Sequence, residues 1–140
     1  MKAIKRMPLI LALALVPGGV AAWRAYNWHD VLAISKTVFE VIGEPGSAAA
    51  DYWCGAGDYV RHALRMSATR RVYIWKAIGP SVAQPGRKAV QFSLSPPENT
   101  SPSPGISLSV KAVGDNLTAA AAFQYCLGGS GHDPFRPRGW

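Results

Sequence analysis

The sequence has only two cysteines and three histidines, and neither type occurs at a spacing that redox or metal chemistry requires. Cys54 and Cys126 are far apart, so there is no CxxC pair of the kind that thioredoxin-like proteins use. The histidines (His29, His62 and His132) form no zinc-ligand spacing with one another or with the cysteines. We therefore expect no metal and no cofactor.

Acidic residues are also scarce, at eight against fifteen lysines and arginines. A glycosidase needs two carboxylates across a cleft, and the sequence alone places no two together. The segment Gly55-Ala56-Gly57 is similar to a phosphate loop but lacks the preceding strand, the third glycine and the following Lys-Ser/Thr. Without zinc spacings or an RNP-like aromatic strand, nucleic acid is not an expected partner.

No apolar run reaches the roughly 20 residues that a membrane-spanning helix needs. The run Met7 to Val16 follows three basic residues, ends at Pro17-Gly18-Gly19, and is followed by Val20-Ala21-Ala22. This three-part pattern is typical of a secretory signal peptide and predicts cleavage before Trp23. A retained membrane anchor is the alternative. We expect residues 1–22 to be removed, leaving a periplasmic or secreted protein without stable membrane insertion.

Much of the net positive charge belongs to this predicted leader. Lys2, Lys5 and Arg6 are lost with it while every acid remains, so the formal charge falls from +7 to +4. The remaining local cluster comprises Arg61, Arg65, Arg70 and Arg71. A solvated helix end explains the cluster most simply, and contact with anionic lipid or glycan is the alternative for an exported chain.

The two cysteines are expected to pair, because an exported domain of this size meets an oxidising compartment. A Cys54–Cys126 bond would close a long loop and stabilise the fold by roughly 4 kcal/mol in the chain-entropy model. A nucleophilic Cys54 is the alternative, but His62 lies two helical turns further along and is too distant to serve as its base.

Residues 23–140 suit one domain, and their patterning predicts an α+β fold in the order β-α-β-β-β-α. Its sheet is expected to be mainly antiparallel, with the helices on one face. The predicted parts are an extended aromatic arm at 23–36, a single domain at 37–127 and a Gly/Pro-rich tail at 128–140. Within the domain we predict strands at 37–43, 71–78, 88–95 and 106–113, and helices at 48–66 and 117–127. A strand at 117–126 is the alternative to the last helix.

The first helix carries the clearest periodic signal. Its wheel turns Tyr52, Trp53 and Ala56 toward the core, and Asp51 and Asp58 toward solvent. Ser47 is the expected N-cap. Cys54 falls to the side, so the last helix is expected to pack along the flank of the first. Gly55 and Gly57 each cost about 1 kcal/mol in a helix relative to alanine, which favours a close approach of another backbone there.

Asp58 and His62 are separated by four residues and are the best candidates for acid–base chemistry. A solvated, salt-linked helix face is the simpler interpretation of this pair. The alternative is a small envelope hydrolase that uses Asp58 and His62 with a carboxylate from elsewhere in the chain.

Aromatic residues give a further hint about binding. Trp23 and Trp28 lie in the arm and Trp140 ends the chain. Aromatic side chains with arginines nearby favour contacts with proteins or glycans, although most internal aromatics fit a core. The candidate binding residues are Trp23, Trp28, Arg61, Arg65, Arg136 and Trp140.

The segment GEPGSAAADYWCGAGDYVRHAL, with the late Cys126, resembles small exported alphaproteobacterial proteins of unknown function that share a DYWCxAGDY-type helix. The resemblance implies a bacterial envelope setting and transfers no catalytic residue. We expect a non-catalytic binding or structural module of the cell envelope, whose partner is an envelope protein or a glycan.

Overall fold

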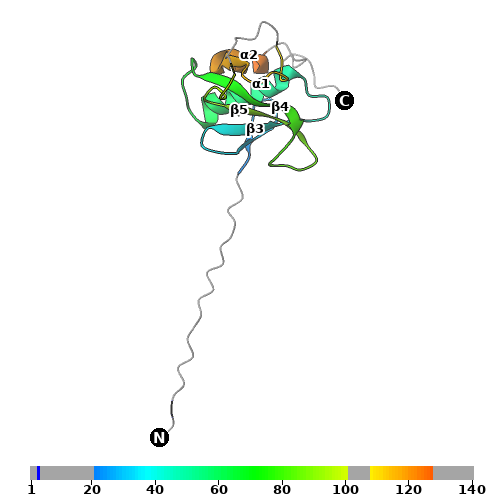
Figure 1. Ribbon diagram of the computed structural model, residues 1–140, viewed down its shortest axis with the longest axis vertical. Helices are drawn as coiled ribbons and strands as arrows, with labels where there is room; N and C mark the ends of the chain where they lie inside the picture. The colour runs from blue at the N-terminus through cyan, green and yellow to red at the C-terminus, as the bar shows by residue number, and fades with distance from the viewer. Residues whose placement is uncertain (1–2, 4–20, 101–107, 128–140) are drawn as a thin grey trace.

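The computed structural model describes residues 3, 21–100 and 108–127. Those residues form one six-stranded antiparallel sheet and two helices, which confirms the α+β class (Figure 1). The sheet order is β1-β2-β3-β5-β4-β6. The strands are β1 (Trp23–Arg24), β2 (Asp30–Ala33), β3 (Val38–Ile42), β4 (Arg71–Pro80), β5 (Lys88–Ser93) and β6 (Asn116–Thr118).

Helix α1 (Ala49–Asp58) continues without a break into one π-helical turn, η1 (Tyr59–Ala63), where Leu64 N–H donates to the carbonyl of Tyr59. Ser47 is not its N-cap. Instead, Asp51 Oδ2 accepts from the backbone N–H of Ala48 at 2.8 Å, which satisfies one of the free donors at the helix start and places a negative charge at its positive end.

The main core lies between α1 and the sheet. Trp53, Ala56 and Val60 from the helix pack with Phe39, Val41, Val72, Ile74, Val90 and Phe92 from the strands, as the wheel predicted. Trp53 meets Phe92 edge-on at 4.9 Å between ring centroids, a favourable geometry for aromatic rings. A smaller apolar cluster of Leu32, Ile42 and Ala89 forms separately from this core.

Helix α2 (Ala119–Leu127) lies against α1 (Figure 1). The two glycines of α1 face different neighbours: a Cβ on Gly55 would meet Val41 of β3, and one on Gly57 would meet the backbone of α2. The predicted close backbone approach is therefore confirmed at Gly57. Cys54 is fully buried, because α2 packs along that flank of the helix and is bonded to it there, as the wheel predicted.

Two predictions about the chain path are wrong. The extended arm at 23–36 is a strand–turn–strand unit, and its strands β1 and β2 extend the sheet beyond β3. The strand predicted at 106–113 is absent from 108–113. Instead, the carbonyl of Ser109 accepts a hydrogen bond from the Trp53 indole N–H, and the carbonyl of Val110 accepts one from the backbone N–H of Ile78. Ile78 lies in β4, whose pairing with β5 is interrupted by bulges.

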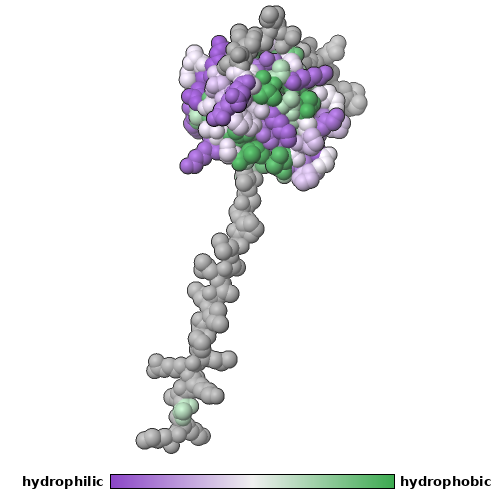
Figure 2. Space-filling model, in the orientation of Figure 1, coloured by the Kyte–Doolittle hydropathy of each residue, from purple (hydrophilic) through white to green (hydrophobic). Residues whose placement is uncertain are grey.

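Residues 116–127 contain both of the alternatives predicted for this segment, a short strand followed by a helix. Leu117 and Thr118 pair with β4 as part of β6, and the alanine-rich residues that follow form α2. Thr118 Oγ1 accepts from the N–H of Ala121, as a cap does at a helix start. The surface seen in Figure 2 is mostly hydrophilic, with hydrophobic side chains gathered in small groups among the polar ones.

Candidate functional site

The connection between β1 and β2 is a tight turn over residues 25–29. The N–H of Ala25 donates to the carbonyl of His29, and the N–H of Trp28 donates back to Ala25, both at 2.9 Å. Trp28 has a φ of 68°, in the left-handed region that bulky residues rarely adopt. Holding a tryptophan there costs on the order of 1–2 kcal/mol, so the surrounding contacts must impose this conformation.

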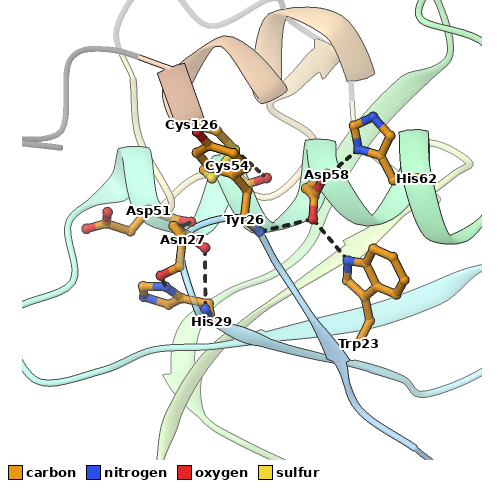
Figure 3. Close-up of a disulfide and its surroundings, with 9 residues drawn as sticks. All are labelled: Trp23, Tyr26, Asn27, His29, Asp51, Cys54, Asp58, His62 and Cys126. Atoms are coloured by element: carbon orange, nitrogen blue, oxygen red, sulfur yellow. Dashed lines mark hydrogen bonds and ion pairs between the residues drawn. A yellow bond between two sulfur atoms is a disulfide. The ribbon is translucent and has the colours of Figure 1, made fainter. Parts of the chain in front are cut away.

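Hydrogen bonds to the helix supply that constraint. The turn runs along α1 (Figure 3) and is tied to it or to the residues just before it at three points. The bonds are Tyr26 N–H to Asp58 Oδ2 (3.1 Å), Asn27 Nδ2 to the carbonyl of Asp51 (2.9 Å) and His29 Nε2 with Ser47 Oγ (2.7 Å). A loop held in this way loses little conformational entropy when a partner binds it.

Asp58 is the centre of this attachment. Its side chain is buried, so the prediction that it faces solvent is wrong. Oδ2 accepts from the Trp23 indole at 3.0 Å as well as from Tyr26, and Oδ1 lies 2.7 Å from His62 Nδ1 (Figure 3). A buried carboxylate needs such donors, and here they come from β1, the turn and η1 together. Asp58 therefore fixes the N-terminal strand and turn onto the helix.

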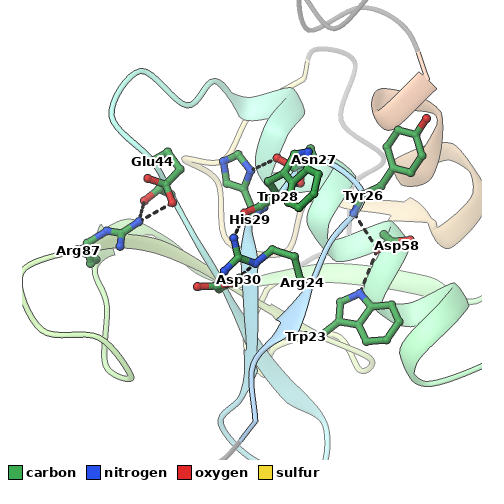
Figure 4. A network of polar contacts seen from close by, with 11 residues as sticks. Trp23, Arg24, Tyr26, Asn27, Trp28, His29, Asp30, Glu44, Asp58 and Arg87 are labelled. Carbon is green, nitrogen blue, oxygen red and sulfur yellow. Dashed lines mark hydrogen bonds and ion pairs between the residues drawn. The ribbon is translucent and has the colours of Figure 1, made fainter. Parts of the chain in front are cut away.

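The turn presents two aromatic side chains to solvent. Tyr26 is 59% exposed and Trp28 is 55% exposed, although the backbone of both residues is hydrogen-bonded. The Tyr26 ring points away from Asp58 toward α2, where it meets Phe123 edge-on at 6.2 Å (Figure 4). We call Tyr26, Asn27 and Trp28 the aromatic turn. Its combination of rigid backbone and exposed rings is typical of a binding surface.

The disulfide joins the two helices behind this surface. Cys54 of α1 is bonded to Cys126 of α2, with a Cα–Cα distance of 4.9 Å, which confirms the predicted pair. Cys54 therefore carries no free thiol to act as a nucleophile. Burial raises the pKa of the Tyr59 phenol and, together with the charge of Asp51, that of Tyr52, so both stay neutral at ordinary pH.

The candidate binding residues predicted from the sequence lie in different places and have different roles in the structure. Trp23 is half-buried and its indole is bonded to Asp58, so it acts as an anchor, whereas Trp28 is exposed on the aromatic turn. Arg61 and Arg65 lie on and just after η1, beyond Asp58. Arg136 and Trp140 lie outside the described residues.

A second polar cluster, which the sequence did not indicate, surrounds Glu40 on β3. The carboxylate is fully buried and accepts from Ser81 Oγ, from the N–H groups of Val82 and Ala83, and from Gln91 Nε2. Burial alone raises the pKa of Glu40, but these hydrogen bonds outweigh it and hold the pKa below its ordinary value. Glu40 thus fastens the loop between β4 and β5 onto the sheet.

Within the ranges described, no three His, Cys, Asp or Glu side chains come together as a metal site would require. The same residues include no helix with the length and apolar character needed to cross a bilayer. Comparisons of the chain with protein-family models, with curated proteins and with solved structures found no match.

Proposed function

We propose that this protein is an exported, disulfide-linked binding module of the bacterial cell envelope, and that the aromatic turn contacts its partner. The observation that carries the proposal is the turn itself. It holds Trp28 in an unfavourable backbone conformation and leaves the Tyr26 and Trp28 rings largely exposed. Backbone strain of this kind is typical of functional surfaces.

The chemistry of the turn favours a protein partner. Tyrosine and tryptophan dominate the residues whose truncation weakens protein interfaces most, because each buries a large area through few rotatable bonds. Asn27 between them is fixed through its bond to the Asp51 carbonyl. A glycan is the alternative partner for exposed aromatic rings, and periodate oxidation of the extract distinguishes a glycan from a protein.

Two observations support export. The disulfide is consistent with an oxidising compartment. In addition, Ala21 and Ala22 are exposed and irregular, and the first strand begins at Trp23. Cleavage between Ala22 and Trp23 therefore removes no residue of the sheet, and the expected start of the mature chain coincides with the start of the fold. A mass measurement showing a mature chain that starts elsewhere would contradict this.

The turn can be tested with two double variants immobilised on resin. Y26A/W28A removes both exposed rings of the turn, and W75A/V82A removes two exposed apolar side chains from β4 and the following loop. A partner present in envelope extract should be retained by the wild type and by W75A/V82A, and lost from Y26A/W28A. Protease treatment of the extract should abolish retention, whereas periodate oxidation would abolish it for a glycan. Equal retention by both variants would refute the proposal.

A hydrolase that uses Asp58 and His62 is the second candidate, favoured by one observation. Asp58 Oδ1 lies 2.7 Å from His62 Nδ1 while the imidazole is half exposed, which is how a carboxylate orients a histidine base. The other carboxylate oxygen holds Trp23 and Tyr26, however, so a structural role already accounts for this residue. Hydrolysis of nitrophenyl esters by the wild type, lost in His62→Gln, would support the hydrolase.

A further inference from the structure

A long part of the chain carries positive charge and no acid. Between Asp58 and Glu98 there is no aspartate or glutamate, and four arginines lie within residues 61–71. We call Arg61, Arg65, Arg70 and Arg71 the arginine end. They lie on and beyond η1 and at the start of β4, so one connection of the fold carries all four.

Hydrogen bonds in the structure do not neutralise these charges. Arg70 donates to the carbonyl of Leu94 at 3.2 Å, and Arg71 donates to the amide oxygen of Asn116 at 2.8 Å. Both acceptors are uncharged. Among the described residues, the ion pairs formed by arginine are Arg24–Asp30 and Arg87–Glu44, both away from this connection. The arginine end is thus a region of uncompensated positive charge.

Two further features of this connection are the backbone conformation of Arg65 and the exposed side chain of Leu64. Arg65 has a φ of 53°, a left-handed position where helices commonly end in glycine, so a bulky cation occupies it at an energetic cost. Leu64, beside it, is 36% exposed. An exposed apolar side chain flanked by arginines suits the boundary between phosphate headgroups and acyl chains.

We infer that the arginine end docks on an anionic bilayer surface through the phosphates of its lipids. Charge complementarity favours this occupant, because guanidinium groups bind phosphate in a bidentate manner and an acidic bilayer attracts exposed cations. The inference concerns different side chains from those of the aromatic turn. Asn27 is tied to Asp51 near the start of α1 and Tyr26 to Asp58 at its end, one turn before Arg61, whereas Arg65 follows the end of η1.

Co-sedimentation with vesicles tests this inference. The purified, oxidised protein should bind vesicles of phosphatidylcholine that contain about 30 mol% phosphatidylglycerol and should not bind phosphatidylcholine alone. R61Q/R65Q should bind the anionic vesicles roughly 30-fold more weakly, because each basic residue at such a surface contributes about fivefold. R61K/R65K keeps both charges at the same positions and should retain most of the binding.

The matched control is K76Q/K88Q, which removes two exposed positive charges from the sheet. It should bind nearly as well as the wild type. Equal weakening of K76Q/K88Q and R61Q/R65Q would overturn the inference, since net charge alone would then explain binding. Absence of binding at low salt would also overturn it. Release by inorganic phosphate beyond that caused by chloride at equal ionic strength would show a site for free phosphate instead.

Discussion

Gly57→Ala should destabilise the packing of α2 on α1, and the structure sets the size of the effect. A Cβ at this position would lie 2.4 Å from the Phe123 nitrogen, 2.8 Å from the Ala122 carbonyl carbon and 2.9 Å from the Ala119 oxygen. All three are backbone atoms of α2, so no side-chain rotation can relieve the contacts. The helix cannot simply move away either, because the Cys54–Cys126 bond holds it one turn along α1.

The expected loss follows from two opposing contributions. Overpacking of this kind costs up to about 3 kcal/mol, and the higher helix propensity of alanine returns about 1 kcal/mol. We therefore expect Gly57→Ala to lower the free energy of unfolding by about 2 kcal/mol, measured by urea denaturation of the oxidised protein with an unchanged m-value.

Gly55→Ala is the matched control for this prediction. This variant gains the same helix propensity, but its Cβ would lie 2.8 Å from a methyl group of the Val41 side chain and not against backbone atoms. Rotation of that side chain can relieve part of the contact, so the loss should be less than half that of Gly57→Ala. A Gly57→Ala variant as stable as the wild type would refute the close packing of α2 on α1.

Three further predictions concern the polar and covalent links. Replacing Cys54 and Cys126 by serine should lower the free energy of unfolding by about 4 kcal/mol in chemical denaturation, and a loss below about 1 kcal/mol would contradict a stabilising crosslink. Asp58→Asn should lower the free energy of unfolding by about 2 kcal/mol and increase hydrogen exchange of the Tyr26 backbone amide, because the single amide oxygen of asparagine cannot accept from Trp23, Tyr26 and His62 together. Unchanged exchange would argue against Asp58 as the anchor of the turn. For Glu40, the folded pKa is lowered, so its stabilisation is complete above the ordinary value of 4.5 and is lost as pH falls through the lower folded value. Glu40→Gln should therefore cost about 2 kcal/mol at neutral pH and flatten the fall in stability below pH 4.5, and an equally steep fall in the variant would contradict this.

The parts of the fold that the sequence predicted correctly depend on local patterning. Apolar periodicity located α1, and β-branched or alternating runs located β3, β4 and β5. The count of two cysteines and the predicted signal peptide together predicted the Cys54–Cys126 bond. Each of these signals is contained in a short segment or in composition, so no knowledge of tertiary contacts was needed.

The errors arise where a distant segment determines the outcome. A helical wheel places Asp58 opposite the sheet, but it cannot show that β1 and the turn cover that side and bury the carboxylate. The segment WRAYNWHD carries no glycine or proline to signal a turn, so β1 and β2 were missed. Glu40 interrupts an apolar strand, and its partners Ser81 and Gln91 lie far along the chain.

The central claim is that the aromatic turn contacts a partner in the envelope, and photocrosslinking in living cells tests it most directly. A benzophenone amino acid is placed at position 28, at position 26 or, as a control with comparable exposure, at position 75. Irradiation should give one discrete protein adduct from positions 26 and 28 and none of that mass from position 75. No adduct from the turn, or the same adducts from all three positions, would contradict the account.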